Sequence, residues 1–287
     1  MKIIDIINGE KPSLSFEVFP PKTSEAVEQI TAATEKIAEL KPSYISVTYG
    51  AGGGTSDYTV MVASNIKKKY GVETVAHLSC ISSGKARVRA ELDRLRDNGI
   101  ENILALRGDL TDDLDSDKLE YHYASELVSE VKEYGGFCIG GACYPEGHPE
   151  SDSSIDDINH LKTKINAGCE YLTTQMFFDN NILYNFLYRL RDSGVNVPVV
   201  AGIMPVTNPK SIRRICSISG TLLPQRFIRI VERYGGNAEA MKQAGIAYAT
   251  EQIIDLFANG VNAVHVYSMD KPDVAAKIAE NISEIIA

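Results

Sequence analysis

The segment SLSFEVFPP, residues 13–21, carries the pattern that decides the fold. Its first seven residues form a short apolar run that holds one carboxylate, Glu17, and the pair Pro20-Pro21 ends the run. An open sheet that binds dinucleotides carries G-x-G-x-x-G directly after its first strand, and two prolines take that place here. The first strand therefore argues against a doubly wound open sheet.

Segments of the same kind recur along the whole 287-residue chain. Eight short apolar runs, rich in Val, Ile and small residues, have the composition of strands buried on both faces of a parallel sheet. They lie at residues 13–19, 44–49, 74–80, 102–107, 137–144, 171–176, 198–204 and 263–267. Amphipathic helices are predicted between and after them, at residues 24–40, 55–70, 84–98, 121–134, 154–167, 180–193, 209–219, 223–234, 238–258 and 272–286.

Eight strand–helix units favour an α/β fold of the closed (β/α)8 TIM-barrel type, with the open sheet as the alternative. The richest glycine run, residues 50–54, follows the second strand and lacks the dinucleotide-binding spacing. No Pro- or Ser-rich linker interrupts the series. We therefore expect residues 1–287 to form a single domain.

The charge, hydropathy and cysteine pattern argue against several kinds of partner and location. A formal net charge of −9 disfavours nucleic acid and anionic membranes. No apolar run approaches the ~18 residues of a membrane span, and the first residues lack a secretion signal, so we expect a cytoplasmic protein. No pair of cysteines has C-x-x-C spacing, which favours buried, reduced thiols at Cys80, Cys138, Cys143, Cys169 and Cys216.

Polar side chains gather where the predicted strands end, and the chemistry of β/α barrels takes place at that end. Glu17 lies between apolar neighbours, where burial would raise its pKa and suit a general acid near neutral pH. Taken alone, His77 reads as a satisfied core histidine, and residues 107–109 (RGD) read as a turn with an ion pair. We find no metal-binding spacing, nucleophile elbow or phosphate loop, and predict no metal.

Seven motifs occur in the order and spacing of one known family. They are SFEVFPPK (15–22), SVTYGAGG (46–53), AHLSC (76–80), LALRGD (104–109), YPEGHPE (144–150), TTQMFFD (173–179) and GIMPV (202–206). Together they resemble the methylenetetrahydrofolate reductases from about Ser15 to Lys271. The resemblance implies a β/α barrel with non-covalent FAD at its C-terminal face. NAD(P)H would reduce the flavin and leave, and 5,10-methylenetetrahydrofolate would then be reduced to 5-methyltetrahydrofolate in a ping-pong reaction.

The resemblance also implies a role for individual residues. Glu17 matches the general acid that protonates N10 of the folate, and Asp109 matches the aspartate beside the flavin that stabilises the cationic iminium. The substrate-binding positions would be Glu17, Asp109, Gln175, Ser211 and Lys271. The cofactor-binding positions would be Thr48, His77, Arg107, Gly108, Asp109, Tyr123, Ala124, Tyr144, His148, Asp157, His160 and Lys164.

The chain departs from a well-known bacterial branch of the family at four positions. Ile215 replaces an aromatic residue, Ser211 a glutamine, Thr163 a basic residue and His160 an amide. These changes concern the electron donor, so a flavin subunit of a larger complex with an electron-transfer partner stays open. A proline dehydrogenase-like flavin barrel stays open too, as does a non-redox barrel such as an aldolase or folate-dependent methyltransferase. We expect a homo-oligomer.

Overall fold

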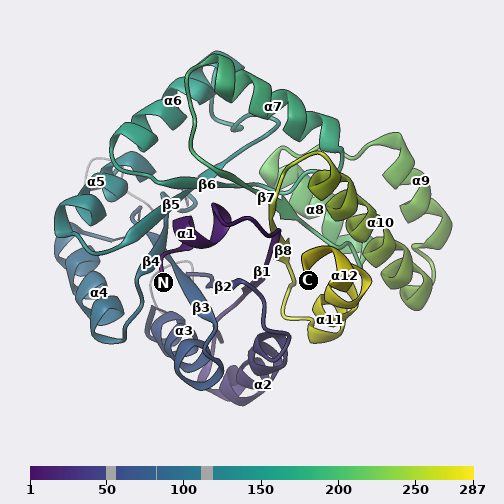
Figure 1. The fold of residues 1–287 in the computed structure, drawn as a ribbon, viewed down its shortest axis with the longest axis horizontal. Helices are drawn as coiled ribbons and strands as arrows, with labels where there is room; N and C mark the ends of the chain where they lie inside the picture. Colours follow the sequence, from purple (N-terminus) through teal and green to yellow (C-terminus); the bar gives the residue numbers. More distant parts are fainter. Residues whose placement is uncertain (50–55, 82, 111–118) are drawn as a thin grey trace.

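Eight parallel strands form a closed barrel inside a ring of helices (Figure 1). The computed structural model describes residues 1–49, 56–81, 83–110 and 119–287, without the side chains of Ser56 and Ser211. Each strand pairs with the next, and β8 pairs with β1, so the predicted TIM barrel is confirmed. The strands are β1 (Ser13–Val18), β2 (Tyr44–Val47), β3 (Glu73–Ser79), β4 (Asn102–Leu106), β5 (Cys138–Cys143), β6 (Tyr171–Thr174), β7 (Val199–Ile203) and β8 (Ala263–Tyr267).

The helices lie close to their predicted ranges. They are α2 (Val27–Ala38), α3 (Ser56–Tyr70), α4 (Lys85–Asp97), α5 (Ala124–Tyr134), α6 (Ser154–Asn166), α7 (Asn180–Asp192), α8 (Pro209–Ser219), α9 (Gln225–Tyr234), α10 (Ala238–Ala258), α11 (Pro272–Asn281) and α12 (Ser283–Ile286). The predicted helix 24–40 begins with a 3-10 turn, η1 (Ser24–Ala26), and the predicted helix 272–286 is broken at the buried Ile282. No helix of the described ranges is both long and apolar enough to cross a membrane.

One further helix, α1 (Ile3–Ile7), was not predicted, because five residues are too few to show a helical period. It lies across the centre of the ring of strands (Figure 1). Ile3 and Ile7 pack against inward-facing side chains of several strands, among them Tyr44, Val75 and Leu104. The N-terminal end of the barrel is therefore closed by an apolar plug.

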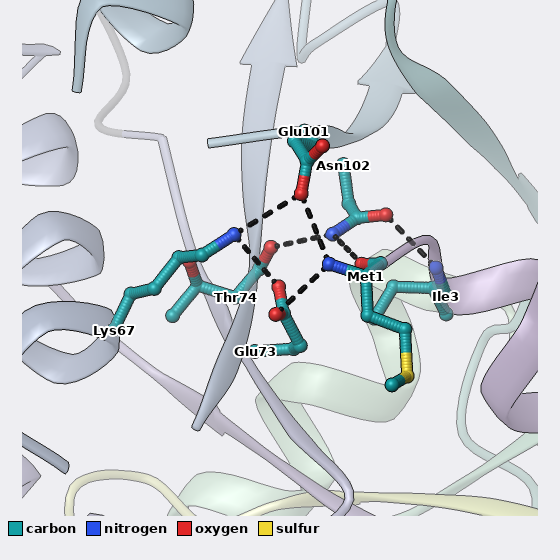
Figure 2. A network of polar contacts seen from close by, with 7 residues as sticks. All are labelled: Met1, Ile3, Lys67, Glu73, Thr74, Glu101 and Asn102. Carbon is teal, nitrogen blue, oxygen red and sulfur yellow. Dashed lines mark hydrogen bonds and ion pairs between the residues drawn. The ribbon is translucent and has the colours of Figure 1, made fainter. Parts of the chain in front are cut away.

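A cluster of charged groups lies beside the start of this plug, at Met1 (Figure 2). The N-terminal ammonium of Met1 lies 2.9 Å from a carboxylate oxygen of both Glu73 and Glu101. Lys67 bridges the same two carboxylates at 2.9 and 3.3 Å. Both carboxylates in this network therefore face cations.

Asn102 ties α1 to the strands beneath it. Its side chain is fully buried at the start of β4, and its Oδ1 accepts a hydrogen bond from the backbone N–H of Ile3 at 2.9 Å. Its Nδ2 donates to the backbone oxygens of Met1 and Thr74, each at 3.2 Å (Figure 2). This end of the barrel is thus fixed by buried polar contacts, which leaves the C-terminal end for ligands.

We expect Asn102→Leu to lower the free energy of unfolding by about 1–3 kcal/mol, because it leaves the buried Ile3 N–H without an acceptor. Chemical denaturation measures the change. The exposed Asn196 provides the matched control, and Asn196→Leu should change stability by less than about 0.5 kcal/mol. Equal stability of the wild-type protein and Asn102→Leu would show that α1 is not held by this side chain.

Candidate functional site

Glu17 lies in the mouth of the barrel. Its neighbours Phe16 and Val18 are fully buried in the core outside the strands, so the alternation along β1 directs Glu17 inward. The strand register places it beside Ser46 and Tyr267. Only 9% of Glu17 is exposed, and burial, with a smaller contribution from the charge of Asp270, raises the pKa of its carboxyl to about 8. The carboxyl group therefore carries its proton at neutral pH.

His77 of β3 is one ionisable neighbour that the barrel brings to Glu17. Its Nε2 lies 3.7 Å from Glu17 Oε2, outside normal hydrogen-bond reach. Burial lowers the pKa of His77 to about 4, so burial disfavours both charges of this pair and we treat both groups as neutral. Within the described residues, His77 Nε2 has no hydrogen-bond partner. The reading of His77 as a satisfied core histidine is therefore wrong.

The description as a satisfied core histidine does fit His265, on β8. Its Nδ1 lies 2.7 Å from Ser15 Oγ and its Nε2 lies 2.9 Å from Ser46 Oγ, so both ring nitrogens have partners. Burial lowers its pKa to about 3, which keeps the ring neutral. His265 therefore has a structural role in the barrel interior, whereas Nε2 of His77 has no partner within the described residues and is available to a ligand.

Gly202 of β7 makes room for Tyr267 beside Glu17. A Cβ atom on this glycine would lie 2.6 Å from the Tyr267 hydroxyl oxygen, closer than real side chains approach. The Tyr267 hydroxyl donates to the backbone oxygen of Thr174 at 2.5 Å. Burial keeps the pKa of Tyr267 well above its usual value, so this neighbour of Glu17 is neutral as well.

A second polar group follows β4 and β5. The predicted ion pair of Arg107 exists, but its partner is Glu150: the guanidinium Nη1 and Nη2 lie 2.5 and 2.6 Å from the two carboxylate oxygens. Asp109 is exposed. Burial is the largest cause of the raised pKa of Tyr144, and the charge of Asp109 is the second, so the two side chains lie near one another. Gly108 has φ +93°, a conformation that side chains rarely adopt.

Lys164 of α6 extends toward β5. Its Nζ donates to the backbone oxygen of Ala142 at 2.7 Å, and burial lowers its pKa. Gly141 is needed beneath it, because a Cβ atom there would lie 2.7 Å from Lys164 Cδ. Asp157, 6% exposed on the same helix, accepts from Ser151 Oγ at 3.4 Å, and burial raises its pKa.

Further aromatic and backbone contacts lie around the mouth. The rings of Tyr144 and His148 meet edge to face with 4.6 Å between their centroids. Thr48 follows β2 and donates its N–H to the oxygen of Val18 at 3.0 Å. Gln175 follows β6, and its Oε1 accepts from the N–H of Met176.

The remaining predicted positions lie on the periphery or outside the described part of the structure. Tyr123 is exposed just before α5, His160 is exposed on α6, and Ala124 begins α5. Lys271, before α11, is exposed and donates to Thr207 Oγ1 at 2.5 Å. The side chain of Ser211, on α8, is not among the described side chains, and residues 50–53 of the second motif also lie outside the described ranges.

The structure adds one residue that sequence patterns did not reveal. Asp270, in the loop after β8, accepts a hydrogen bond from the backbone N–H of Phe19 at 2.9 Å through Oδ1. The two residues are 251 positions apart, and nothing local marks Asp270 among the many acids of the chain. The register of β8 beside β1 brings it to Glu17.

Unpartnered polar atoms at the mouth are compatible with the cofactor that the resemblance implies. Among the described residues, no three His, Cys, Asp or Glu side chains are arranged to hold a metal. His77 offers an unpartnered nitrogen, and Lys164 has used one of its three N–H donors on Ala142. All five cysteines are buried and unpaired, as predicted.

Comparison with known proteins identifies relatives of this chain. A family model described as methylenetetrahydrofolate reductase matches residues 2–283. The 5,10-methylenetetrahydrofolate reductase of Escherichia coli is 34% identical over 270 residues, 94% of this chain and 90% of that protein. Methylenetetrahydrofolate reductase (NADH) 1 of Arabidopsis thaliana is 33% identical over 305 residues, 99% of this chain. The chain spans 51% of the length of that plant protein.

Solved structures share the fold at lower identity. An uncharacterized protein from Clostridium thermocellum, described as binding two copies of 5-methyl-5,6,7,8-tetrahydrofolic acid, matches with a TM-score of 0.68 and 16% identity over 99% of both chains. A dihydropteroate synthase of Xanthomonas albilineans matches with a TM-score of 0.53, 15% identity and 96% and 92% coverage of the two chains. At these identities the likeness concerns the fold alone.

The raised pKa of Glu17 predicts a pH-dependent stability. The folded protein binds this proton more tightly than the unfolded chain, so stability is greatest below the ordinary pKa of 4.5 and is lost as pH rises toward about 8. We expect Glu17→Gln to remove this loss, which amounts to about 1.4 kcal/mol per pH unit across the window. Denaturation of both proteins between pH 5 and 8 measures it, with the exposed Glu25→Gln as control. Parallel curves for the wild-type protein and Glu17→Gln would contradict the assignment.

Proposed function

The chain belongs to the methylenetetrahydrofolate reductase family, and we propose that residues 1–287 form one catalytic domain that binds FAD and reduces 5,10-methylenetetrahydrofolate to 5-methyltetrahydrofolate. The observation that carries this proposal is the burial of Glu17 at the mouth of the barrel, which raises the pKa of its carboxyl group to about 8. A reductase of this substrate needs an acid that holds a proton at neutral pH and gives it to a ring nitrogen. A buried carboxyl group meets that requirement.

In this reaction Glu17 donates its proton to N10 of the folate. The bond between N10 and the bridging methylene carbon breaks, its electron pair stays on N10, and the methylene becomes an N5 iminium cation that accepts a hydride. The ionised Glu17 then regains a proton from solvent. His77 and Tyr267, which lie beside Glu17, are both kept neutral by burial, so neither forms an ion pair with it.

Asp109 and Gln175 complete the proposed folate site. Asp109 follows β4 near Arg107 and Tyr144, and its anionic carboxylate would stabilise the cationic iminium. Gln175 would contact the pterin, Lys271 the anionic tail of the folate, and Ser211 would take a substrate-binding position on α8. The roles of Asp109 and Gln175 rest on their places in two of the family's motifs. Those of Lys271 and Ser211 rest on positions outside the motifs, and Ser211 replaces a glutamine there.

FAD, when bound, supplies the hydride carrier between the nicotinamide and the folate. The residues that would hold FAD are Lys164, His77, Gly108, Tyr144, His148 and Asp157, together with Thr48, Tyr123, Ala124 and His160. Lys164 is better placed than Arg107 to bind a diphosphate, because a carboxylate already occupies both outer nitrogens of the Arg107 guanidinium.

We propose NADH as the electron donor, in a ping-pong reaction at this same mouth. The plant relatives carry NADH in their names. A cytoplasmic location and a homo-oligomer stay predictions of the sequence. A flavin subunit that takes electrons from a partner protein remains the second candidate, because Ile215 and Ser211 stand where a bacterial branch has an aromatic residue and a glutamine. Stopped-flow reduction of the bound flavin by NADH and then NADPH separates the candidates, and a yellow protein that neither reduces favours the partner subunit.

We expect Glu17→Gln to lower the rate of the folate half-reaction by at least about 100-fold, the usual contribution of a general acid. Reduction of the flavin by NADH should change by less than about threefold, because no proton from Glu17 is needed there. Stopped-flow spectroscopy measures the two half-reactions separately.

The exposed Glu25→Gln is the control and should leave both rates unchanged. Equal loss of both half-reactions in Glu17→Gln would remove the acid from the mechanism. A wild-type protein that turns over proline would favour a proline dehydrogenase-like enzyme, and one purified without a flavin spectrum would favour a non-redox barrel.

We expect Lys164→Met to weaken FAD binding by about 10-fold or more, since a charge-assisted hydrogen bond to phosphate contributes about 1.5–3 kcal/mol. The dissociation constant for FAD, measured by flavin fluorescence on reconstitution, reports the loss. Lys162→Met, two residues away on α6, is the matched control and should bind FAD as the wild-type protein does. An unchanged constant for Lys164→Met would assign the diphosphate to other residues.

A further inference from the structure

The loop that follows β8 is attached to the end of β1. Ser268 Oγ donates to the backbone oxygen of Glu17 at 2.6 Å, and the backbone N–H of Phe19 donates to Asp270 Oδ1 at 2.9 Å. These two bonds continue the pairing of β8 with β1, in which Glu17 lies beside Tyr267. The loop therefore fixes a second carboxyl group next to the strand that carries the acid.

The backbone of this loop is held in an uncommon conformation. Met269 and Asp270 both have positive φ, 53° and 52°, in the left-handed region that residues other than glycine seldom occupy. Such conformations persist where the surrounding structure enforces them, and they gather at functional sites. Here they direct the Asp270 carboxyl group back to the Phe19 N–H.

The groups that face Glu17 come from two elements. His77, on β3, is neutral, and Tyr267, on β8, is neutral and donates to Thr174. Asp270 is the remaining ionisable neighbour among the described residues. The burial of Glu17 is the largest cause of its raised pKa, and the charge of Asp270 is the second. Within the described residues, no cation compensates the two carboxyl groups.

Hydrogen bonding decides which of the two carboxyl groups holds the proton. Asp270 accepts the Phe19 N–H, which favours its anionic form and opposes the effect of burial on its pKa. The Glu17 carboxyl group accepts no hydrogen bond within the described residues, so nothing there favours its anion. Two nearby carboxyl groups of unequal environment share their protons unequally.

We propose that Asp270 is a positioning residue for the proton of Glu17: its carboxylate, fixed on the Phe19 amide, acts across the end of β1 and adds to the effect of burial in keeping Glu17 protonated at neutral pH. This inference rests on the proposed function only for its effect on catalysis. The electrostatic coupling itself is a property of the folded chain.

Asp270→Asn tests the proposal, because asparagine keeps an oxygen for the Phe19 N–H and loses the charge. The carboxyl stretch of Glu17, assigned by infrared difference against Glu17→Gln, is titrated in both proteins. We expect its midpoint to fall by about one pH unit. The alkaline limb of the folate half-reaction should fall by the same amount, which is about a tenfold loss of rate above both midpoints and no loss well below them.

Asp273→Asn, on the first turn of α11, is the matched control. Asp273 is paired with Lys242 on the surface, and its replacement should leave the midpoint of Glu17 unchanged. If Asp270→Asn folds poorly, Asp270→Gly removes the same charge and suits the positive φ.

The outcomes separate the two proposals. A shifted infrared midpoint in a protein that does not reduce the folate would retain Asp270 and reject the proposed function. An unshifted midpoint in an active reductase, or an equal shift in Asp273→Asn, would overturn the role of Asp270 and leave the proposed function intact.

Discussion

The desolvation of one carboxyl group, that of Glu17, governs the mouth of this barrel. Burial is the largest cause of its raised pKa, and the neutral states of His77 and Tyr267 have the same cause. Because a charge inside the mouth would be poorly solvated, Glu17 stays protonated and forms no ion pair with His77. The chemistry that the site can perform therefore begins with proton donation.

The two ends of the barrel handle their carboxylates in opposite ways. At the N-terminal end, Glu73 and Glu101 both contact Lys67, and the apolar residues of α1 fill the space between the strands. At the C-terminal end, Glu17 has no cation beside it among the described residues, and its second carboxyl neighbour is Asp270. Paired charges stabilise a closed end, whereas an unpaired and protonated acid costs stability and is suited to reaction.

Sequence patterns predicted the features that lie within one segment and missed the contacts between residues far apart along the chain. Each strand is a short apolar run whose signal lies within the segment itself, so all eight were identified. The five residues of α1 are too short for a period, and the pairing of Arg107 with Glu150 joins two motifs that lie far apart along the chain. The contact of Asp270 with Phe19 exists only because β8 closes the barrel against β1. The resemblance to the family indicated Glu17 and Lys164, but not the neighbours that set their protonation.

In the proposed reaction, the same desolvation would keep the proton on Glu17 until the folate is in place. A ligand that covers the mouth excludes water and deepens the desolvation of Glu17, which holds the proton more firmly until a basic nitrogen is present to receive it. In the proposed reaction, transfer of the proton to N10 would leave Glu17 as an anion beside Asp270 and the folate as a cation. The repulsion between the two carboxylates would then be offset by their attraction to the iminium, so an arrangement that is unfavourable in the free protein would be complementary to the charge that develops in the proposed reaction.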